Sequence, residues 1–186
     1  MILSVIVPVY NEAKTIKQLI EKVIAVGIDK EIVVVDDSST DGTDKILRDM
    51  RYENLKVIHH SSNRGKGAAI LTGLSQASGE YVVVQDADLE YDPGDYLKLM
   101  DHLKKGEGDI ILGARFTEGY RGRLIPKAGN RLLTGLLNVL FGVKLNDCFT
   151  CYKFMRRLDL NSLSLESSSF DIEIEILAKA IKKKMR

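Results

Sequence analysis

The chain has 186 residues, of which 45% are apolar and 28% are charged, and its formal net charge is only +1. Residues 1–186 are long enough for a single ordinary globular domain, and the small net charge argues against nucleic acid as a partner. The two cysteines are too few for a zinc site or a disulfide framework, which indicates a reducing compartment. No basic segment precedes a long apolar stretch at the start, and no apolar run reaches the roughly 20 residues that span a bilayer, so we expect neither a signal peptide nor a transmembrane helix.

Short β-branched runs alternate with amphipathic stretches along the first part of the chain. The expected strands, in chain order, are residues 2–7, 31–36, 55–59, 81–85 and 109–112. The helices expected between them are residues 12–26, 41–51, 65–77 and 93–105. Such alternation builds a mostly parallel sheet flanked by helices, so the pattern predicts an α/β fold.

The alternation breaks after Arg115. Residues 116–126 contain Arg121 and Arg123 and are expected to form a loop, followed by a helix at residues 127–141. That helix is apolar nearly all round, so part of it faces lipid or a partner, or else all of it packs on the sheet; the pattern leaves both open. A strand or turn at residues 147–155 and a helix at residues 171–184 complete the chain.

Acidic residues follow the ends of several expected strands, at the sheet edge where ligands of such folds bind. Asp86 and Asp88 follow the apolar residues 81–84, with only Gln85 between. Carboxylates two positions apart on an extended segment point the same way and can bind a hard divalent cation. That cation would bridge the diphosphate of a nucleotide. A solvated strand end explains the same spacing, so the pair alone does not decide between the two interpretations.

Two further motifs lie at the same predicted edge. Asp37 could accept hydrogen bonds from a base or ribose, whereas capping of the next helix explains Asp41. The turn at residues 63–68, Asn-Arg-Gly-Lys-Gly-Ala, could hold an anion at a helix start. It lacks the spacing of a Walker or dinucleotide-binding loop, and a plain tight turn explains it as well.

Taken together and in this order, these motifs resemble those of family 2 glycosyltransferases. The matching stretches are residues 7–12, 35–43, 63–68 and 86–89. Later stretches are similar to the dolichyl-phosphate mannose synthase group, at residues 113–115, 129–131, 147–153 and 170–173. Within the third of these, Cys151 and Lys153 stand where that group usually has glycine and arginine.

The resemblance implies a GT-A fold and a metal-dependent, inverting transfer of a sugar from a GDP- or UDP-linked donor to a polyprenyl phosphate, either dolichyl or undecaprenyl phosphate. The residues that it assigns to the donor are Pro8, Tyr10, Glu12, Val35, Asp37, Asp86, Ala87 and Asp88. Mg²⁺ or Mn²⁺ would lie among Asp86, Asp88 and Glu90. Catalysis would depend on Asp88, with Arg115 and Arg123 binding the acceptor phosphate. The resemblance further implies a cytoplasmic protein, held peripherally at the cytoplasmic face of the membrane.

Other functions fit parts of this pattern. A GT-A enzyme that transfers sugar to a saccharide or protein hydroxyl needs a carboxylate base near the acceptor, and Asp147 is the only obvious downstream candidate. A GT-A-like domain could also bind the nucleotide-sugar without catalysis. A nucleotidyltransferase is disfavoured, because residues 9–12 stand where its glycine-rich basic loop would follow the first strand.

Overall fold

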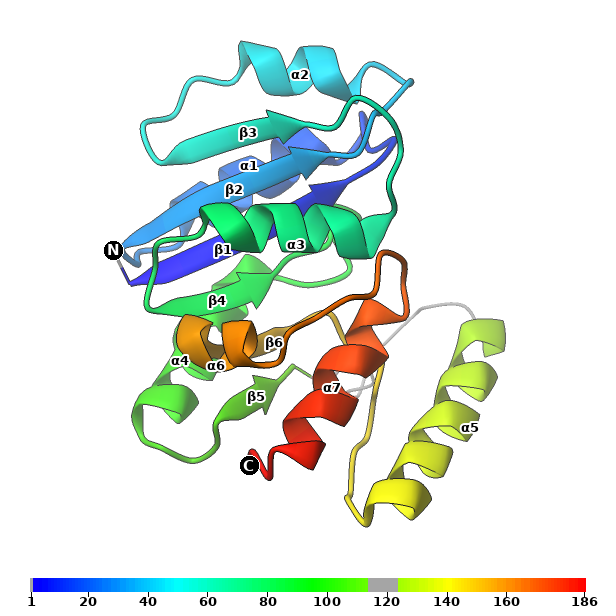
Figure 1. The fold of residues 1–186 in the computed structure, drawn as a ribbon. Coiled ribbons are helices and arrows are strands. Elements are labelled where there is room, and N and C mark those ends of the chain that lie inside the picture. The colour runs from blue at the N-terminus through cyan, green and yellow to red at the C-terminus, as the bar shows by residue number, and fades with distance from the viewer. Residues whose placement is uncertain (1, 114–123) are drawn as a thin grey trace.

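The computed structural model describes residues 2–113 and 124–186, with the side chains of residues 124–128 left out. These residues form a six-stranded sheet in the order β3-β2-β1-β4-β6-β5 (Figure 1). The strands are β1 (Leu3–Val9), β2 (Lys30–Asp36), β3 (Leu55–His59), β4 (Tyr81–Val84), β5 (Ile110–Leu112) and β6 (Lys153–Arg156). Strands β1 to β4 pair in parallel, whereas β6 runs antiparallel to both β4 and β5. The predicted α/β fold with a mostly parallel sheet is confirmed.

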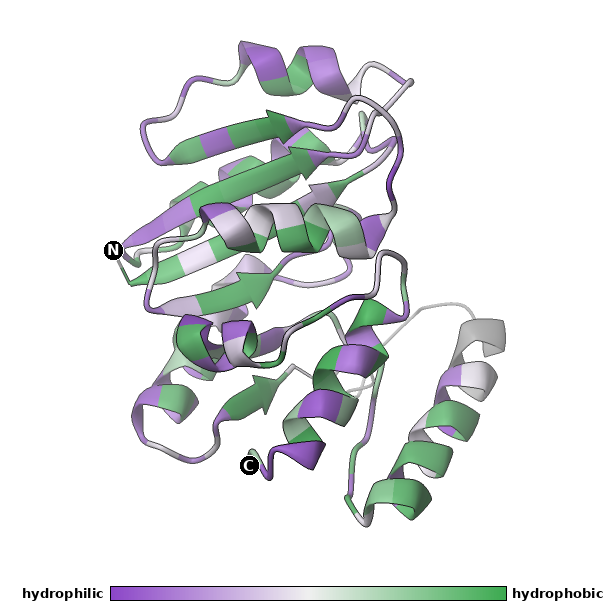
Figure 2. Cartoon of the chain, viewed as in Figure 1, coloured by the Kyte–Doolittle hydropathy of each residue, from purple (hydrophilic) through white to green (hydrophobic). Residues whose placement is uncertain are grey.

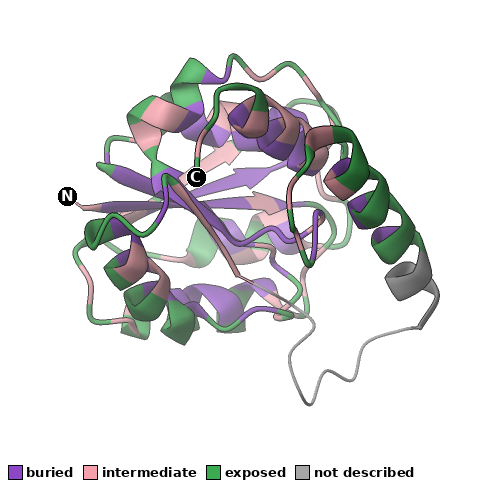
Figure 3. Cartoon of the chain, turned by 90° about the horizontal axis from the view of Figure 1, so that it is seen from below, coloured by how far each residue is buried: buried purple, intermediate pink, exposed green. Residues whose placement is uncertain are grey.

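Helices cover both faces of this sheet. They are α1 (Ile16–Ala25), α2 (Thr43–Asp49), α3 (Lys66–Gln76), the short 3-10 turn η1 (Pro93–Asp95) leading into α4 (Tyr96–Lys104), α5 (Leu124–Phe141), α6 (Arg157–Ser162) and α7 (Ile172–Lys182). Apolar side chains of α1, α2 and α4 pack on one face, and those of α3, α6 and α7 pack on the other. Helix α5 lies outside α7, at the edge of the molecule (Figures 1 and 3).

Strand β2 is apolar almost without interruption because both of its faces are buried. Ile32 and Val34 pack into the core beneath α1, while Val33 and Val35 pack against Ala69 of α3 on the opposite face. A strand covered on both sides has no position for a solvated side chain. The central strands are accordingly hydrophobic along most of their length (Figure 2).

The later part of the chain differs more from the expectation. Most of the predicted loop at residues 116–126 lies outside the described residues. The two arginines expected to bind the acceptor, Arg115 and Arg123, lie outside them too. Residues 124–126 already belong to α5, which begins at Leu124 rather than at residue 127. In the described part of the chain, no helix is both long enough and apolar enough to cross a bilayer.

Candidate active site

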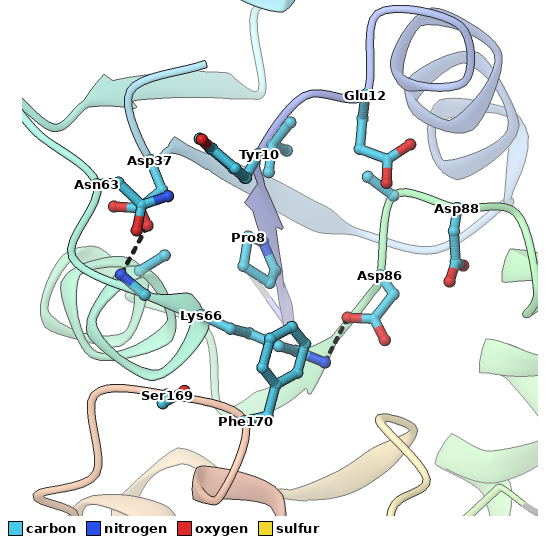
Figure 4. A pocket seen from close by; sticks show the side chains of 14 residues that line it. Pro8, Tyr10, Glu12, Asp37, Asn63, Lys66, Asp86, Asp88, Ser169 and Phe170 are labelled. Carbon is cyan, nitrogen blue, oxygen red and sulfur yellow. Dashed lines mark hydrogen bonds and ion pairs between the residues drawn. The ribbon is translucent and has the colours of Figure 1, made fainter. Parts of the chain in front are cut away.

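A cavity of about 440 Å³ opens at the carboxyl ends of β1, β2 and β4 (Figure 4). Its lining comes from these strand ends, from the start of α3 and from the loop before α7. The lining residues are Pro8, Val9, Tyr10, Glu12, Asp37, Asn63, Gly65, Lys66, Ala69, Asp86, Ala87, Asp88, Ser169 and Phe170. The edge of the sheet that the acidic motifs predict as a binding site is therefore hollow.

Side-chain hydrogen bonds join the loop after β1 to the loop after β2 and to the start of α2. Asn11 has a φ of 58°, in the left-handed region that asparagine tolerates better than most residues. Its side-chain oxygen accepts a hydrogen bond from the Thr40 N–H at 2.8 Å, and its own N–H donates to Ser39 Oγ at 2.9 Å. The Glu12 N–H donates to Thr43 Oγ1 at 2.9 Å. These bonds fix the wall of the cavity that carries Tyr10 and Glu12.

Asp37 also lines the cavity, on the side of Tyr10 (Figure 4), and it is almost fully buried, with 3% of its surface exposed. One carboxylate oxygen accepts a hydrogen bond from the Arg64 N–H at 2.9 Å and lies 2.6 Å from His60 Nδ1. The other oxygen accepts from the Gly65 N–H at 2.7 Å. Asp37 therefore holds the turn before α3 in place, besides lining the cavity.

Lys66, the first residue of α3, places a positive charge inside the cavity. Its Nζ lies 2.7 Å from Asp86 Oδ1 and 3.1 Å from Glu173 Oε1. Burial acts to lower the pKa of Lys66, but the carboxylates of Asp86 and Glu173 outweigh it, and the pKa lies above its ordinary value. The ammonium is therefore charged, and it neutralises part of the acidic wall.

Asp88 is the more exposed of the two acids, and its environment differs from that of Asp86. Partial desolvation raises the pKa of Asp88, and the negative charge of Asp86 raises it further, although a hydrogen bond from the Glu90 N–H at 3.0 Å acts in the opposite direction. A carboxylate with a raised pKa gains from a nearby cation, because the cation stabilises its ionised form.

The oxygens of Asp86 and Asp88 are of the kind that Mg²⁺ and Mn²⁺ prefer. In residues 2–113 and 124–186 no three His, Cys, Asp or Glu side chains gather as a metal-binding group. Of the three residues expected around the cation, Asp86 and Asp88 line the cavity, whereas Glu90 does not. The chain turns at Leu89, whose φ is 64°, and the Glu90 backbone bonds back to Asp88. Two carboxylates thus remain, which fit a cation whose other ligands come from a bound diphosphate.

The structure brings together most of the residues that the sequence singles out for the donor. Seven line the cavity: Pro8, Tyr10, Glu12, Asp37, Asp86, Ala87 and Asp88. Val35 does not, because its side chain is fully buried against α3. Sequence reasoning did not assign Lys66, Ser169 or Phe170 to the site. The Gly-Lys-Gly turn is the one signal that pointed towards Lys66.

Asp147, the candidate base for a hydroxyl acceptor, lies elsewhere. Only 4% of its surface is exposed, and it does not line the cavity. Its Oδ1 accepts hydrogen bonds from Asn130 Nδ2 at 2.7 Å and from the Phe149 N–H at 3.0 Å. These contacts connect α5 to the loop that precedes β6. Asp147 therefore has a structural role.

The sheet order and the acidic cavity at its carboxyl edge are those of a GT-A-type α/β protein. TarS residues 1–349 of S. aureus, solved in complex with UDP, superpose with a TM-score of 0.72 at 26% identity, over 96% of this chain and 55% of that one. Glucosyl-3-phosphoglycerate synthase of Mycobacterium tuberculosis, solved with Mn²⁺, UDP and phosphoglyceric acid, gives 0.75 at 25% identity, over 98% and 64%.

Residues 4–163 match the family described as Glycosyl transferase family 2, and the chain belongs to that family. It is 32% identical to a protein of Pyrococcus furiosus named dolichol-phosphate mannosyltransferase, over 96% of this chain and 53% of that protein. It is 30% identical to the dodecaprenyl-phosphate galacturonate synthase of Rhizobium johnstonii, over 88% and 50%. The chain thus spans about half the length of these two relatives.

Proposed function

We propose that this chain carries the donor site of a polyprenyl-phosphate glycosyltransferase. The observation that carries the proposal is the single cavity into which β1, β2 and β4 bring Tyr10, Asp37 and the pair Asp86 and Asp88. A hollow of this kind, with acids at one wall and an aromatic side chain at another, suits a nucleoside diphosphate. Family membership and the names of two similar proteins, which both act on polyprenyl phosphates, support this assignment.

Asp86 and Asp88 would hold Mg²⁺ or Mn²⁺ together with the diphosphate of a GDP- or UDP-linked sugar. The cation would neutralise charge on the diphosphate as it leaves. Tyr10 and Asp37 stand on the walls away from these acids, where they would contact the nucleoside (Figure 4). Lys66 adds a second positive charge beside Asp86.

The acceptor in this proposal is a lipid phosphate, which is already an anionic nucleophile and needs no strong base. Its oxygen forms a bond to the anomeric carbon while the bond from that carbon to the diphosphate breaks, and attack from the opposite face inverts configuration. The burial of Asp147 supports this acceptor over a hydroxyl, because the described residue that was the candidate base is committed elsewhere. Arg115 and Arg123 stay predicted ligands of the acceptor phosphate.

A lipid acceptor requires contact with a membrane, and α5 offers a surface for it. Five of its apolar side chains are exposed: Leu132, Leu133, Leu136, Val139 and Leu140. Most of the helix is coloured hydrophobic in Figure 2. We assign the chain to the cytoplasmic face as a peripheral protein, in keeping with the free thiols of Cys148 and Cys151.

The test is transfer of radiolabelled sugar from GDP- and UDP-linked donors to dolichyl phosphate in the presence of Mn²⁺. A polyprenyl-phosphate product carries the label into organic solvent, whereas a saccharide product leaves it in water. We expect label in the organic phase, and we expect Asp88→Ala to reduce it by about 100-fold or more, equivalent to about 2.7 kcal/mol of transition-state stabilisation. The fold should survive, because Asp88 is exposed.

Asp95→Asn is the matched control, since Asp95 is an exposed acid in η1 that does not line the cavity. It should transfer sugar at the wild-type rate. Near-normal activity of Asp88→Ala with Mn²⁺ present would contradict the role of this carboxylate. Nucleotide binding without transfer to any acceptor would instead favour a binding-only domain.

A further inference from the structure

Glu173, in the first turn of α7, is a buried carboxylate between two lysines. Only 3% of its surface is exposed. Its Oε2 is paired with Nζ of Lys153, a β6 residue that is equally buried and also donates to the Thr150 carbonyl. Its Oε1 lies 3.1 Å from Nζ of Lys66 and has no hydrogen bond of good geometry among the described residues. One oxygen is thus used for the fold, and the other is directed at a cavity-lining ammonium.

The charges continue from Glu173 to the cavity wall. Lys66 joins Glu173 to Asp86, and the four side chains Lys153, Glu173, Lys66 and Asp86 alternate in sign from the interior to the cavity. The ring of Phe170 lies over the Lys66 ammonium, 5.8 Å from its centroid (Figure 4). Asp88 lines the same wall but stands outside this chain of ion pairs.

Charge balance alone would need only Lys153 beside Glu173. The second contact, to Lys66, limits where a long and flexible side chain can place its ammonium. An ammonium has three N–H donors, and Asp86 and Glu173 lie within reach of two of them. One N–H is left over from these two contacts, and because Lys66 lines the cavity it is available to a diphosphate bound there.

We propose that Glu173 is a positioning residue for the donor: it holds the Lys66 ammonium at the cavity wall, where Lys66 contacts both Asp86 and a donor phosphate. The inference rests on the function proposed above, because it needs a nucleoside diphosphate in this cavity. It adds a residue outside the cavity lining that acts through Lys66. It also makes α7 part of the donor site.

The test is titration of the purified protein with UDP and with GDP, each with and without Mn²⁺, by calorimetry. We expect Glu173→Gln to weaken binding of the preferred nucleotide by about 10-fold or more. The variant should also be less stable, since Lys153 is left buried without its carboxylate. Asp171→Asn is the matched control, because Asp171 precedes the same helix but is exposed. It should bind like the wild type.

The double variant Glu173→Gln/Lys153→Met separates positioning from stability. It removes both buried charges of the inner pair, so the melting temperature should return towards that of the wild type. Nucleotide binding should stay weak, because Lys66 still lacks its second carboxylate. Recovery of affinity together with the melting temperature would show that Glu173 acts only on the fold, and would overturn the proposal.

Lys66→Met supplies the remaining comparison. If Glu173 acts through Lys66, adding Glu173→Gln to Lys66→Met should weaken binding less than 2-fold further, whereas independent effects would multiply. Multiplying losses would overturn the inference, as would wild-type affinity in Glu173→Gln. With either of these two results, the donor-site proposal would still hold if the wild-type protein binds UDP or GDP. Binding of neither nucleotide to the wild type would overturn both.

Discussion

Both carboxylate oxygens of Asp37 accept hydrogen bonds from the turn that carries Lys66 into the cavity. The donors are the Arg64 and Gly65 N–H groups, and His60 packs against the same carboxylate. Asp37, which the sequence predicts as a ligand for the nucleoside, therefore also holds the neighbouring loop in place. Because these contacts span 27 and 28 residues of sequence, no local pattern could reveal them.

Glu175 gives a residue-scale prediction about pH. Burial acts to raise its pKa, but hydrogen bonds from Lys179 and from the backbone of Ser167 and Glu166 outweigh it and lower the pKa to about 2, from an ordinary value of 4.5. Since the folded pKa lies below the unfolded one, this stabilisation is fully present above pH 4.5 and is lost as the pH falls towards 2. We expect Glu175→Gln to lower the free energy of unfolding at pH 7 by roughly 2 to 3 kcal/mol.

Urea unfolding at several pH values between 7 and 2.5 measures the difference between wild type and Glu175→Gln. The difference should shrink steadily below pH 4.5. Glu53→Gln is the control, because Glu53 is exposed; it should change stability little at any pH. A difference for Glu175→Gln that does not depend on pH would show that the lost contacts, and not the ionisation, stabilise the loop at residues 166–167.

At the scale of elements, the start of α3 packs directly on the backbone of the loop before α7. The Ala68 N–H donates to the Ser168 carbonyl at 3.1 Å. A Cβ at Gly67 would lie 2.7 Å from the Ser168 carbonyl carbon and closer still to the Ser167 oxygen, so an alanine there forces the two segments apart. We expect Gly67→Ala to lower the free energy of unfolding by about 2 kcal/mol or more, as overpacking does.

Gly135→Ala is the matched control for that prediction. Gly135 lies in α5, where an added Cβ meets nothing within 4 Å. Alanine favours a helix over glycine by up to about 1 kcal/mol, so this variant should be slightly more stable than the wild type. Urea unfolding of both variants gives the comparison. Equal stability of Gly67→Ala and the wild type would mean that the loop before α7 shifts without cost.

The sequence predicts the first elements well because their signals are local. Strand β3 has the predicted bounds, since a short apolar run and its flanking turns define it. The predicted helix at residues 12–26 begins only at Ile16. Residues 11–13 bond instead to the loop after β2 and to the first residue of α2, with the Ala13 N–H donating to Asp41 Oδ2 at 3.0 Å. A distant partner outweighs helix propensity there.

Prediction is weakest where pairing is long-range. The region at residues 147–155 is expected to form a strand or turn, but nothing in it indicates that β6 inserts antiparallel between β4 and β5. In that register Met155 pairs with both Val82 and Ile110. Helix α6 follows at once and is not predicted, because its 6 residues are too few to show a helical period.

At the scale of the whole molecule, α5 differs from the helices that cover the sheet. Among its described side chains, the buried ones are Asn130, Thr134 and Leu137, a narrow stripe of which two members are polar. Most other apolar side chains of the helix are exposed, as in Leu132 and Val139, which are 75% and 83% exposed. Figure 3 shows the exposed side of α5 at the periphery. The sequence leaves core packing and an outward face equally open, and the structure places the apolar face outward.

This arrangement predicts that α5 binds a lipid surface. Each large apolar side chain gains about 1.5 to 3 kcal/mol when it leaves water completely, so the double variant Leu132→Gln/Val139→Gln should reduce binding to sedimented phosphatidylcholine vesicles by about 10-fold or more. Its melting temperature should stay near that of the wild type, because neither side chain is part of the core.

Leu158→Gln is the matched control for this prediction. Leu158 is a 73% exposed leucine of α6, away from α5, and its variant should bind vesicles like the wild type. If the α5 variant sediments with vesicles as well as the control does, lipid is not what covers this face; the face then serves a protein partner or a second copy of the chain.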